Sequence, residues 1–553
     1  MRVKVKGKLT VRAISGTHVV FLAFSMCKAD IKGLMGFAIQ RIDNTADETI
    51  WLRGNKTFAS IRQSTGIEDA SSHEHPFQGF QWADYSAKPG YSYEYRVIAM
   101  YGRPGALKNG AETSVNIDTE PLAGNKHEIY FNRGAIASQA FSKRFPGLSF
   151  EEAGEPAKDW LTRDLLPGLL DFVGKAKDSS YSIRAAIFEF KLPEALRAFK
   201  EAKAKGADVK IIYHALDDST GRANEDAIDT AKIRSICVGR TNTKLMHNKF
   251  IVLLKNNKPV AVWTGSTNFS TNALYGQLNV GHVLHDTQTA RAFLNYWDAL
   301  EDDPSLNDLK SWNESNNPIP DDDLAELTPM FSPHKGREVY DWWVQLASEK
   351  SLPLFMTFPF GMPKEFRQAY DSDDGVLRFA LLDKYVNGGT AESRAAATED
   401  TIRIRKYQNV GMALGERIFV KWIDGWLPEG NPLGVNVNWV HTKFMLIDPL
   451  GQSPTTLTGS ANFSLPSVNS NEENLIIIRG DTRVADIYFG EFMRLFAHHR
   501  FRESVARHIK EFGSTAFNTW KPQDLFEDYK KWAPRHFVTG TEYDIKRRYF
   551  ADE

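Results

Sequence analysis

The first part of the chain alternates between apolar and polar positions, with the period of two that an extended strand produces. Between residues 91 and 101, Tyr, Val and Ala occupy every second position, so that they share one face of a strand. The Lys88-Pro89-Gly90 turn signal directly precedes this strand, and residues 37–41 alternate in the same way. We therefore predict an all-β domain over residues 1–122, built as a β-sandwich.

The pattern changes after a predicted linker at residues 118–125. A buried strand at residues 181–190 precedes a helix at 193–205 with Pro at its first position, and a second strand follows at 208–214. A helical pattern at 286–300 ends this pass. The same order then recurs, with strands predicted at 352–358 and 376–382 and a helix at 363–369.

Two passes through the same order predict a duplicated fold. The fold class is multidomain α/β, with the β-sandwich followed by two α/β/α lobes. The tail contains Trp520, Trp532, Tyr549 and Phe550 among other aromatic residues, which we expect to pack on the body of the protein. The predicted boundaries are 126–312 for the first lobe, 313–333 for a linker, 334–512 for the second lobe and 513–553 for an aromatic-rich C-terminal extension.

Composition narrows the class of protein. Hydrophobic residues make up 42% and charged residues 25% of the chain, as is usual for globular proteins, and the net charge of −1 gives no overall attraction to polyanions. Cys27 and Cys237 are the only cysteines, and no cluster with metal-ligand spacing accompanies them. The apolar stretch at residues 19–26 is too short to cross a bilayer. We expect a cytoplasmic protein without integral membrane association, cofactor or metal.

One pair of short motifs occurs twice. His247-Asn248-Lys249 and His441-Thr442-Lys443 are each followed by a Thr-Gly-Ser-x-Asn-Phe-Ser segment, and the glycine lies 18 residues after the histidine in both copies. Either motif alone is a common pattern, and Gly-Ser-x-Asn by itself is usually an ordinary turn. The recurrence of both at equal spacing indicates one site built from two copies. Its polar residues are His247, Lys249, Ser266 and Asn268 in the first copy, and His441, Lys443, Ser460 and Asn462 in the second.

These residue types suit a site for one phosphate group. On a strand, His and Lys at positions i and i+2 point to the same side. Two ammonium groups and two carboxamides can surround a tetrahedral phosphate, which is the main requirement of phosphoryl transfer. One imidazole can then attack phosphorus to form a phosphohistidine, while the other protonates the leaving oxygen and later activates water.

The duplicated His-x-Lys and Gly-Ser-x-Asn motifs resemble those of the phospholipase D superfamily over residues 126–510. This resemblance implies a metal-independent phosphodiesterase in which His247 and His441 form the nucleophile and acid pair. It makes Lys249, Lys443, Asn268 and Asn462 phosphate ligands, supported by Ser266 and Ser460. Separately, residues 89–97 resemble strand F of fibronectin type III domains, with Tyr93 at the tyrosine-corner position.

The chain departs from the family pattern in its first copy. The family has an Asp five residues after the Lys, and its role there is largely structural. This position is Asp448 in the second copy and Leu254 in the first. The family's Glu after Gly-Ser-x-Asn, which holds a histidine, corresponds to Glu473, whereas residues 276–279 contain no acid. A carboxylate partner for His441 would favour that residue as nucleophile. Family precedent favours His247, so the order stays open with a slight preference for His247.

The motifs indicate the reaction, and the choice between a nucleic acid and a lipid substrate depends on the residues around them. Basic residues upstream of both motifs favour a nucleic acid over a lipid; they are Arg234, Arg240, Lys244, Arg403, Arg405, Lys406, Arg417 and Lys421. We therefore expect a nuclease-like phosphodiesterase acting on DNA or RNA. A phospholipase D acting on phospholipid head groups, docked through Trp422, Trp426 and Trp439, is the alternative. A module that grips phosphate without turnover is the third hypothesis, and the β domain could bind a partner or a second copy.

Overall fold

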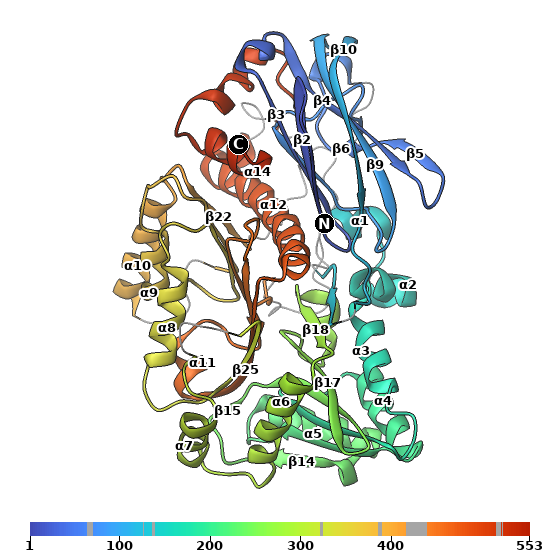
Figure 1. Ribbon diagram of the computed structural model, residues 1–553, viewed down its shortest axis with the longest axis vertical. Helices are drawn as coiled ribbons and strands as arrows, with labels where there is room; N and C mark the ends of the chain where they lie inside the picture. The colour runs from blue at the N-terminus through green and yellow to red at the C-terminus, as the bar shows by residue number, and fades with distance from the viewer. Residues whose placement is uncertain are drawn as a thin grey trace.

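The computed structural model describes the chain except residues 63–69, 125, 135–138, 321–324, 385–389, 416–439, 516–520 and 522–523. The β-sandwich lies at the top in Figure 1, the first lobe at the bottom and the second lobe at the left. The multidomain α/β architecture predicted from the sequence is confirmed.

The N-terminal domain consists of two four-stranded antiparallel sheets with an apolar core between them. One has the order β1 (Arg2–Val5), β2 (Leu9–Ser15), β3 (Val20–Met26), β8 (Gln81–Asp84). The other has the order β10 (Ala106–Asp118), β9 (Ser92–Arg103), β4 (Leu34–Asp43), β5 (Glu48–Trp51), and β6 (Arg53–Gly54) pairs with β7 (Ala70–Ser71). Tyr93, Tyr95 and Val97 are fully buried, as their alternation predicts. The hydroxyl of Tyr93 accepts a hydrogen bond from the Lys88 backbone N–H at 2.9 Å, a contact of the tyrosine-corner kind. The fibronectin type III resemblance itself stays a prediction.

The first lobe is built on a seven-stranded mixed sheet. Its order is β11 (His127–Phe131), β18 (Val280–Leu284), β17 (Lys258–Gly265), β16 (Lys249–Lys255), β12 (Tyr181–Ile187), β13 (Asp208–His214), β14 (Cys237–Arg240). Strands β12, β13 and β14 run parallel and the other pairs antiparallel. The helices of this lobe are α1 (Gln139–Arg144), α2 (Phe150–Thr162), α3 (Leu165–Gly174), α4 (Pro193–Ala204), α5 (Ser219–Ala231) and α6 (Thr287–Glu301).

The second lobe repeats this plan and borrows one strand. Its sheet has the order β15 (Leu245–Met246), β25 (Asn471–Arg479), β24 (Thr455–Gly459), β23 (Phe444–Ile447), β20 (Leu354–Phe358), β21 (Arg378–Leu382), β22 (Val410–Leu414). Strand β15 comes from the first copy of the motif. The remaining helices are α7 (Leu306–Asn316), α8 (Glu338–Ala347), α9 (Lys364–Tyr370), α10 (Ala391–Ile404), α11 (Leu465–Asn469), α12 (Thr482–Phe512) and α14 (Glu542–Ala551).

The segment predicted as a linker, 313–333, contains ordered structure in its described part. It contains the end of α7 and strand β19 (Leu327–Ser332), which pairs antiparallel with β25. The sequence pattern did not show this strand, because Pro329 interrupts a short run with little alternation.

Helix α12 passes through the centre of the molecule, where the three parts meet (Figure 1). Its first half is buried on every side, and Phe489 contacts Phe21 of β3 and Phe550 of α14. Trp532 and Phe550 are fully buried, which confirms for these residues that the C-terminal extension packs on the body. Trp520 lies outside the described residues. Among the described helices, none is long and apolar enough to cross a bilayer.

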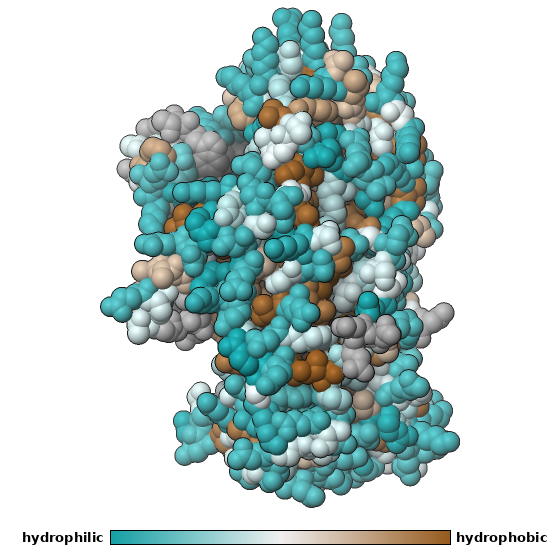
Figure 2. Space-filling model, turned by 60° about the vertical axis from the view of Figure 1, so that its left-hand side comes forward, coloured by the Kyte–Doolittle hydropathy of each residue, from teal (hydrophilic) through white to brown (hydrophobic). Residues whose placement is uncertain are grey.

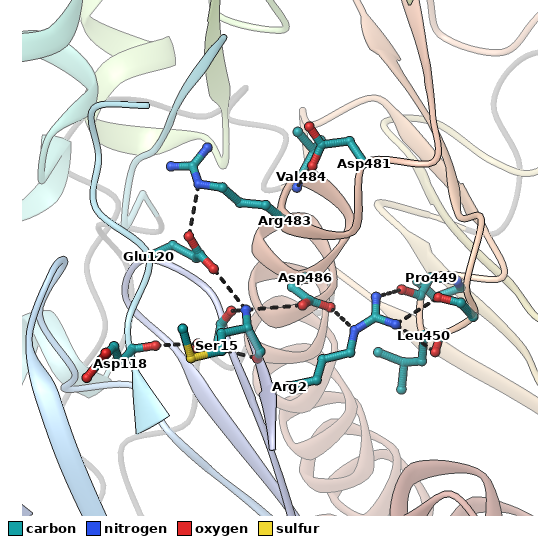
Figure 3. Close-up of polar contacts among 12 residues, drawn as sticks. Arg2, Ser15, Asp118, Glu120, Pro449, Leu450, Asp481, Arg483, Val484 and Asp486 are labelled. Carbon is teal, nitrogen blue, oxygen red and sulfur yellow. Dashed lines mark hydrogen bonds and ion pairs between the residues drawn. The ribbon is translucent and has the colours of Figure 1, made fainter. Parts of the chain in front are cut away.

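Arg2 fastens the β-sandwich to the second lobe (Figure 3). Its Nε donates to Asp486 of α12 at 2.7 Å, and its two terminal nitrogens donate to the backbone carbonyls of Pro449, Leu450 and Gly451 at 2.7–2.8 Å. Asp486 is 1% exposed. A guanidinium satisfied on every side in this way holds the sandwich in a fixed position against the lobe.

Candidate active site

Each histidine of the duplicated motif is held by backbone contacts with the other lobe. Strand β15, directly before His247, pairs with β25, and the His247 N–H donates to the Glu472 carbonyl at 2.9 Å. Reciprocally, Val440 forms a bridge with Leu278, and the His441 N–H donates to the Leu278 carbonyl at 3.3 Å. The two motifs therefore meet at the interface between the lobes.

The two lysines are fully buried beside their histidines. Lys249 Nζ and Lys443 Nζ each donate to the carbonyl of their own histidine at 2.7 Å. Burial lowers the pKa of Lys249 to about 7, although Glu473 and Glu189 favour its charge. Burial and the nearby Lys249 hold the pKa of Lys443 well below its usual range. The two buried ammonium groups repel each other, and the negative charge of an anionic ligand between them would stabilise both.

Glu473 contacts His247 and not His441. Its Oε2 accepts from His247 Nδ1 at 2.7 Å and from the Ser460 hydroxyl at 2.6 Å, and its Oε1 accepts from Asn471 at 3.3 Å. The expectation that Glu473 pairs with the histidine of its own copy is therefore wrong. The physical reason is the exchange of strands, because β25 carries Glu473 to the edge where β15 brings in His247.

Asn279 occupies the equivalent position beside His441. Its Oδ1 accepts from His441 Nδ1 and from the Ser266 hydroxyl, both at 2.8 Å, while its Nδ2 donates to the Ala273 carbonyl at 2.9 Å. The sequence analysis did not identify Asn279, because the family pattern places an acidic residue at this position. The available signal was spacing, since Asn279 and Glu473 each lie 13 residues after the serine of their copy.

Both imidazoles are held in the same tautomer. Asn279 Nδ2 donates to the Ala273 carbonyl, so its Oδ1 faces Ser266 and His441. An amide oxygen can only accept, so the Ser266 hydroxyl and the His441 Nδ1–H must donate to it. Glu473 likewise accepts from His247 Nδ1–H, which leaves Nε2 of each ring without its proton. Burial and then both lysines hold the pKa of each histidine well below its usual range. Each lysine acts on both histidines, so all four side chains converge.

The glycines of the two Gly-Ser segments allow close contact with the neighbouring strand. A Cβ on Gly265 would lie 2.3 Å from the Val280 carbonyl oxygen, and one on Gly459 would lie 2.2 Å from that of Asn474. The N–H groups of Ser266 and Ser460 donate to these same carbonyls at 3.0 and 2.8 Å. Both serines therefore use their donors inside the protein. Their geometry fits support of the histidines' partners and does not fit direct contact with an anion.

Asn268 and Asn462 follow these serines by two residues. The Oδ1 atom of each is buried without a hydrogen-bond partner among the described residues. Buried amide groups are normally satisfied, but an amide oxygen needs a donor, which a phosphodiester lacks. A phosphate oxygen would accept from the Nδ2 groups of these residues instead. Their role as phosphate ligands stays a proposal.

Asp448 does not lie with the site residues. It follows the far end of β23, whose four residues extend about 13 Å from the His441 side of the strand. There its N–H donates to the Pro353 carbonyl at 2.8 Å, next to the carbonyls that Arg2 contacts. Asp448 is therefore placed to support the fold and not the phosphate, in agreement with the structural role that the resemblance implies. Leu254, its counterpart, is packed in the apolar core.

The basic residues upstream of the motifs mostly form ion pairs. Arg240 is fully buried and its guanidinium contacts Glu472 and Asp303. Arg234 contacts Asp229 at 2.8 Å, and Arg403 contacts Asp371 at 2.6 Å. Arg405 contacts Glu503 at 2.5 Å. These arginines do not form an open basic surface, because carboxylates from neighbouring elements meet them. Arg417, Lys421, Trp422, Trp426 and Trp439 lie outside the described residues.

Among the described residues, no group of three or more His, Cys, Asp or Glu side chains is placed to hold a metal ion.

Comparisons with known proteins agree with this geometry. Residues 169–300 and 398–496 match the family described as "Cardiolipin synthase, PLD-like domain", and these segments contain both histidines and both Gly-Ser-x-Asn segments. No curated protein matches closely enough to count as a relative.

Several solved structures are similar to the chain. The phospholipase D family member Nuc from Salmonella typhimurium is 30% identical, covering 24% of this chain and 84% of that one, with a TM-score of 0.22. A phosphatidylserine synthase from Haemophilus influenzae Rd KW20 is 12% identical over 66% of this chain and 94% of that one, with a TM-score of 0.41. The yeast tyrosyl-DNA phosphodiesterase is 12% identical over 57% and 87%, with a TM-score of 0.35.

The duplicated motif, the convergence of its residues and the matched family lead to one assignment: the chain belongs to the phospholipase D superfamily of phosphodiester hydrolases and transferases.

Proposed function

We propose that the protein cleaves phosphodiesters through a phosphohistidine on His247, with His441 as general acid and then general base. The observation that carries this division is the difference between the two acceptors. The carboxylate of Glu473 accepts from His247 Nδ1, whereas the neutral amide of Asn279 accepts from His441 Nδ1.

The charges of the site suit a diester. Lys249 and Lys443 contribute two positive charges when protonated. Glu473, whose pKa burial raises to about 7, contributes one negative charge when ionised. A phosphodiester carries a single negative charge and would bring this group to neutrality. Its arrival would also favour the protonated form of both lysines, whose pKa values burial lowers in its absence.

In the first step, the Nε2 lone pair of His247 attacks phosphorus. A P–N bond forms and the P–O bond to the leaving group breaks, while His441, which must enter this step as the imidazolium, gives its Nε2 proton to the leaving oxygen. The phosphorylated ring is positively charged, and the carboxylate of Glu473 stabilises it through Nδ1–H. A neutral acceptor beside His441 keeps that imidazolium a stronger acid.

In the second step, His441 Nε2 takes a proton from water as the water oxygen attacks phosphorus. The P–N bond breaks, and its electron pair returns to His247. Lys249, Lys443, Asn268 and Asn462 would hold the nonbridging oxygens in both steps. The ammonium groups supply the positive charge, so we expect turnover in the presence of EDTA.

We infer that the substrate is a nucleic acid, and we keep a phospholipid head group as the second candidate. Large apolar side chains that are exposed in the described chain come from separate elements, such as Leu148, Ile402, Phe512 and Val538. Hydrophilic residues cover most of the face drawn in Figure 2, with apolar residues gathered in its middle. The lipid candidate is favoured by the description of the matched family as cardiolipin synthase.

One experiment separates these substrates. The protein is incubated in EDTA with plasmid, single-stranded DNA, RNA and phosphatidylcholine vesicles in parallel, with His441→Ala as the control. We expect cleavage of nucleic acid by the wild-type protein and its loss in the variant. Cleavage of the lipid alone would reject the nucleic-acid assignment, and no cleavage of any substrate would favour a module that binds phosphate without turnover.

A further inference from the structure

A groove of about 580 Å³ lies between α4 and α5 on the first lobe, at the bottom in Figure 1. Its walls carry the cationic side chains of Lys191, Arg197 and Lys200, opposed by the carboxylate of Asp226. Its floor is apolar, with Leu196 and alanines of α5. None of these residues belongs to the duplicated motif.

The groove begins at the rim of the candidate active site. Ile187, the last residue of β12, pairs with Lys249, and the ring of Phe188 lies 5.0 Å from that of His247. The Lys191 N–H donates at 3.0 Å to the carbonyl of Phe269, the residue after Asn268. Four residues therefore lead from Ile187 to Lys191, with a bend at residues 188–189, so this path is at most about 14 Å.

The cations of the groove are only partly neutralised. Lys191 Nζ lies 3.9 Å from Glu189, and Lys200 Nζ donates to the Ala231 carbonyl at 2.8 Å. Within the described part of the chain, the exposed Arg197 guanidinium has no hydrogen bond or ion pair. Three positive charges against the carboxylates of Asp226 and Glu189 leave a net positive charge on this surface, which is the sign that attracts a polyanion.

We propose that the α4–α5 groove binds the phosphates of a nucleic-acid strand on one side of the scissile phosphate. This inference rests on the proposed function. A strand has a phosphate at every nucleotide, so it can contact cations within about 14 Å of the site, while its sugars and bases lie over the apolar floor. A phospholipid offers acyl chains at that distance, and these gain nothing from Lys and Arg.

The test compares two double variants that remove the same charge from the same helix region. Arg197→Ala with Lys200→Ala removes two groove cations, and Lys203→Ala with Lys205→Ala removes two exposed lysines outside the groove. Each is assayed for cleavage of a single-stranded oligonucleotide and of bis(p-nitrophenyl) phosphate. The small diester needs only the central phosphate site. Circular dichroism verifies that both variants fold.

We expect the groove variant to raise KM for the oligonucleotide about tenfold at physiological salt. The slope of log KM against log salt should also fall by about 1.4, which corresponds to two lost contacts with a single strand. Cleavage of the small diester should be unchanged, and the control variant should match the wild type throughout.

Equal oligonucleotide KM values and salt slopes for the two variants would overturn the groove proposal while leaving the diester chemistry intact. The same holds if lipid vesicles, and not the oligonucleotide, are cleaved alongside the small diester. If the wild-type protein cleaves none of the substrates, the proposed function fails first and the groove proposal falls with it.

Discussion

The first and second copies of the motif bring the same residues to the site but hold their histidines through different acceptors. His247 faces the carboxylate of Glu473 at 2.7 Å, and His441 faces the amide of Asn279 at 2.8 Å. Around each acceptor the hydrogen bonds are alike, because a serine hydroxyl donates to the acceptor in both copies. One negative charge is thus the main difference between the two halves of the site.

This difference shows that a repeated motif does not imply repeated roles. The His-x-Lys segment positions a ring and an ammonium group, but the residue that sets the basicity of the ring comes from the other lobe. A carboxylate favours the charged ring and an amide does so less. The division of labour is therefore decided across the interface, and exchange of the acceptors should change it.

The largest loss of kcat/KM should come from removing either histidine. The two losses should depend differently on the leaving group of the substrate. His247→Ala should lower kcat/KM by at least about 10⁴ for every diester, because no nucleophile remains. His441→Ala should lower it by about 10²–10⁴ for an alkoxide leaving group and far less for p-nitrophenolate, which leaves without a proton. Steady-state kinetics with both substrate types measures the contrast.

The same variants offer a direct view of the intermediate. In His441→Ala the second step lacks its base, so a burst of one equivalent of p-nitrophenol and a phosphorylated peptide containing His247 should appear. Detection of the phosphoryl group on His441 in His247→Ala would reverse the assignment.

Removing the charge of Glu473 should have the next largest effect. Glu473→Gln keeps an acceptor for His247 but loses the stabilisation of a positive ring, so kcat should fall by about 10². The matched change is Ser460→Ala, which removes one donor to Glu473 and should lower kcat by about tenfold or less. Equal kcat values for Glu473→Gln and the wild type would show that the carboxylate does not assist the nucleophile.

Adding a charge beside His441 should move the pH profile. The general acid must be protonated, so kcat/KM falls as pH rises through the pKa of His441, which burial and the two lysines hold low. Asn279→Asp supplies a carboxylate that favours imidazolium, so the alkaline limb should shift by about 1–2 pH units to higher pH. Asn279→Ala serves as control and should give no upward shift. An unmoved limb for Asn279→Asp would mean that His441 is not the acid.

The smallest expected effect is on the stability of the protein when either buried lysine is replaced by methionine. Lys443→Met should raise the free energy of unfolding, and Lys249→Met should raise it by less, because Glu189 also favours the charge of Lys249. The folded-state pKa of Lys443 lies below its unfolded value of about 10.4, so burial of the charge destabilises the protein at low pH and less so as pH rises. Urea unfolding should therefore show the largest gain for Lys443→Met near pH 6 and a smaller one near pH 9. A larger gain for Lys249→Met would contradict the comparison.

Local patterns in the sequence predicted most of the fold. The period of two around Tyr93 and Tyr95 found β9, and the repeated His-x-Lys and Gly-Ser-x-Asn spacing found the two lobes and the set of side chains that converge. These features could be predicted because they depend on neighbours within a few residues.

Features that depend on contacts between distant segments could not be predicted. The pairing of Glu473 with His247 results from the exchange of β15 to the second sheet, and no local pattern encodes that exchange. Asn279 carries no charge to draw notice, and its function is visible only once His441 lies against it. For the same reason, the sequence does not show that Arg240 is buried against Glu472.

The reciprocal exchange at the interface also bears on how such a chain can evolve. In a symmetric pair of identical half-length chains, any substitution appears in both halves at once, so an Asn at this position would remove both carboxylates together. Covalent fusion of the two copies ends that constraint, and each acceptor can then change independently. The Asn279–Glu473 asymmetry is therefore one that a pair of identical half-length chains could not hold.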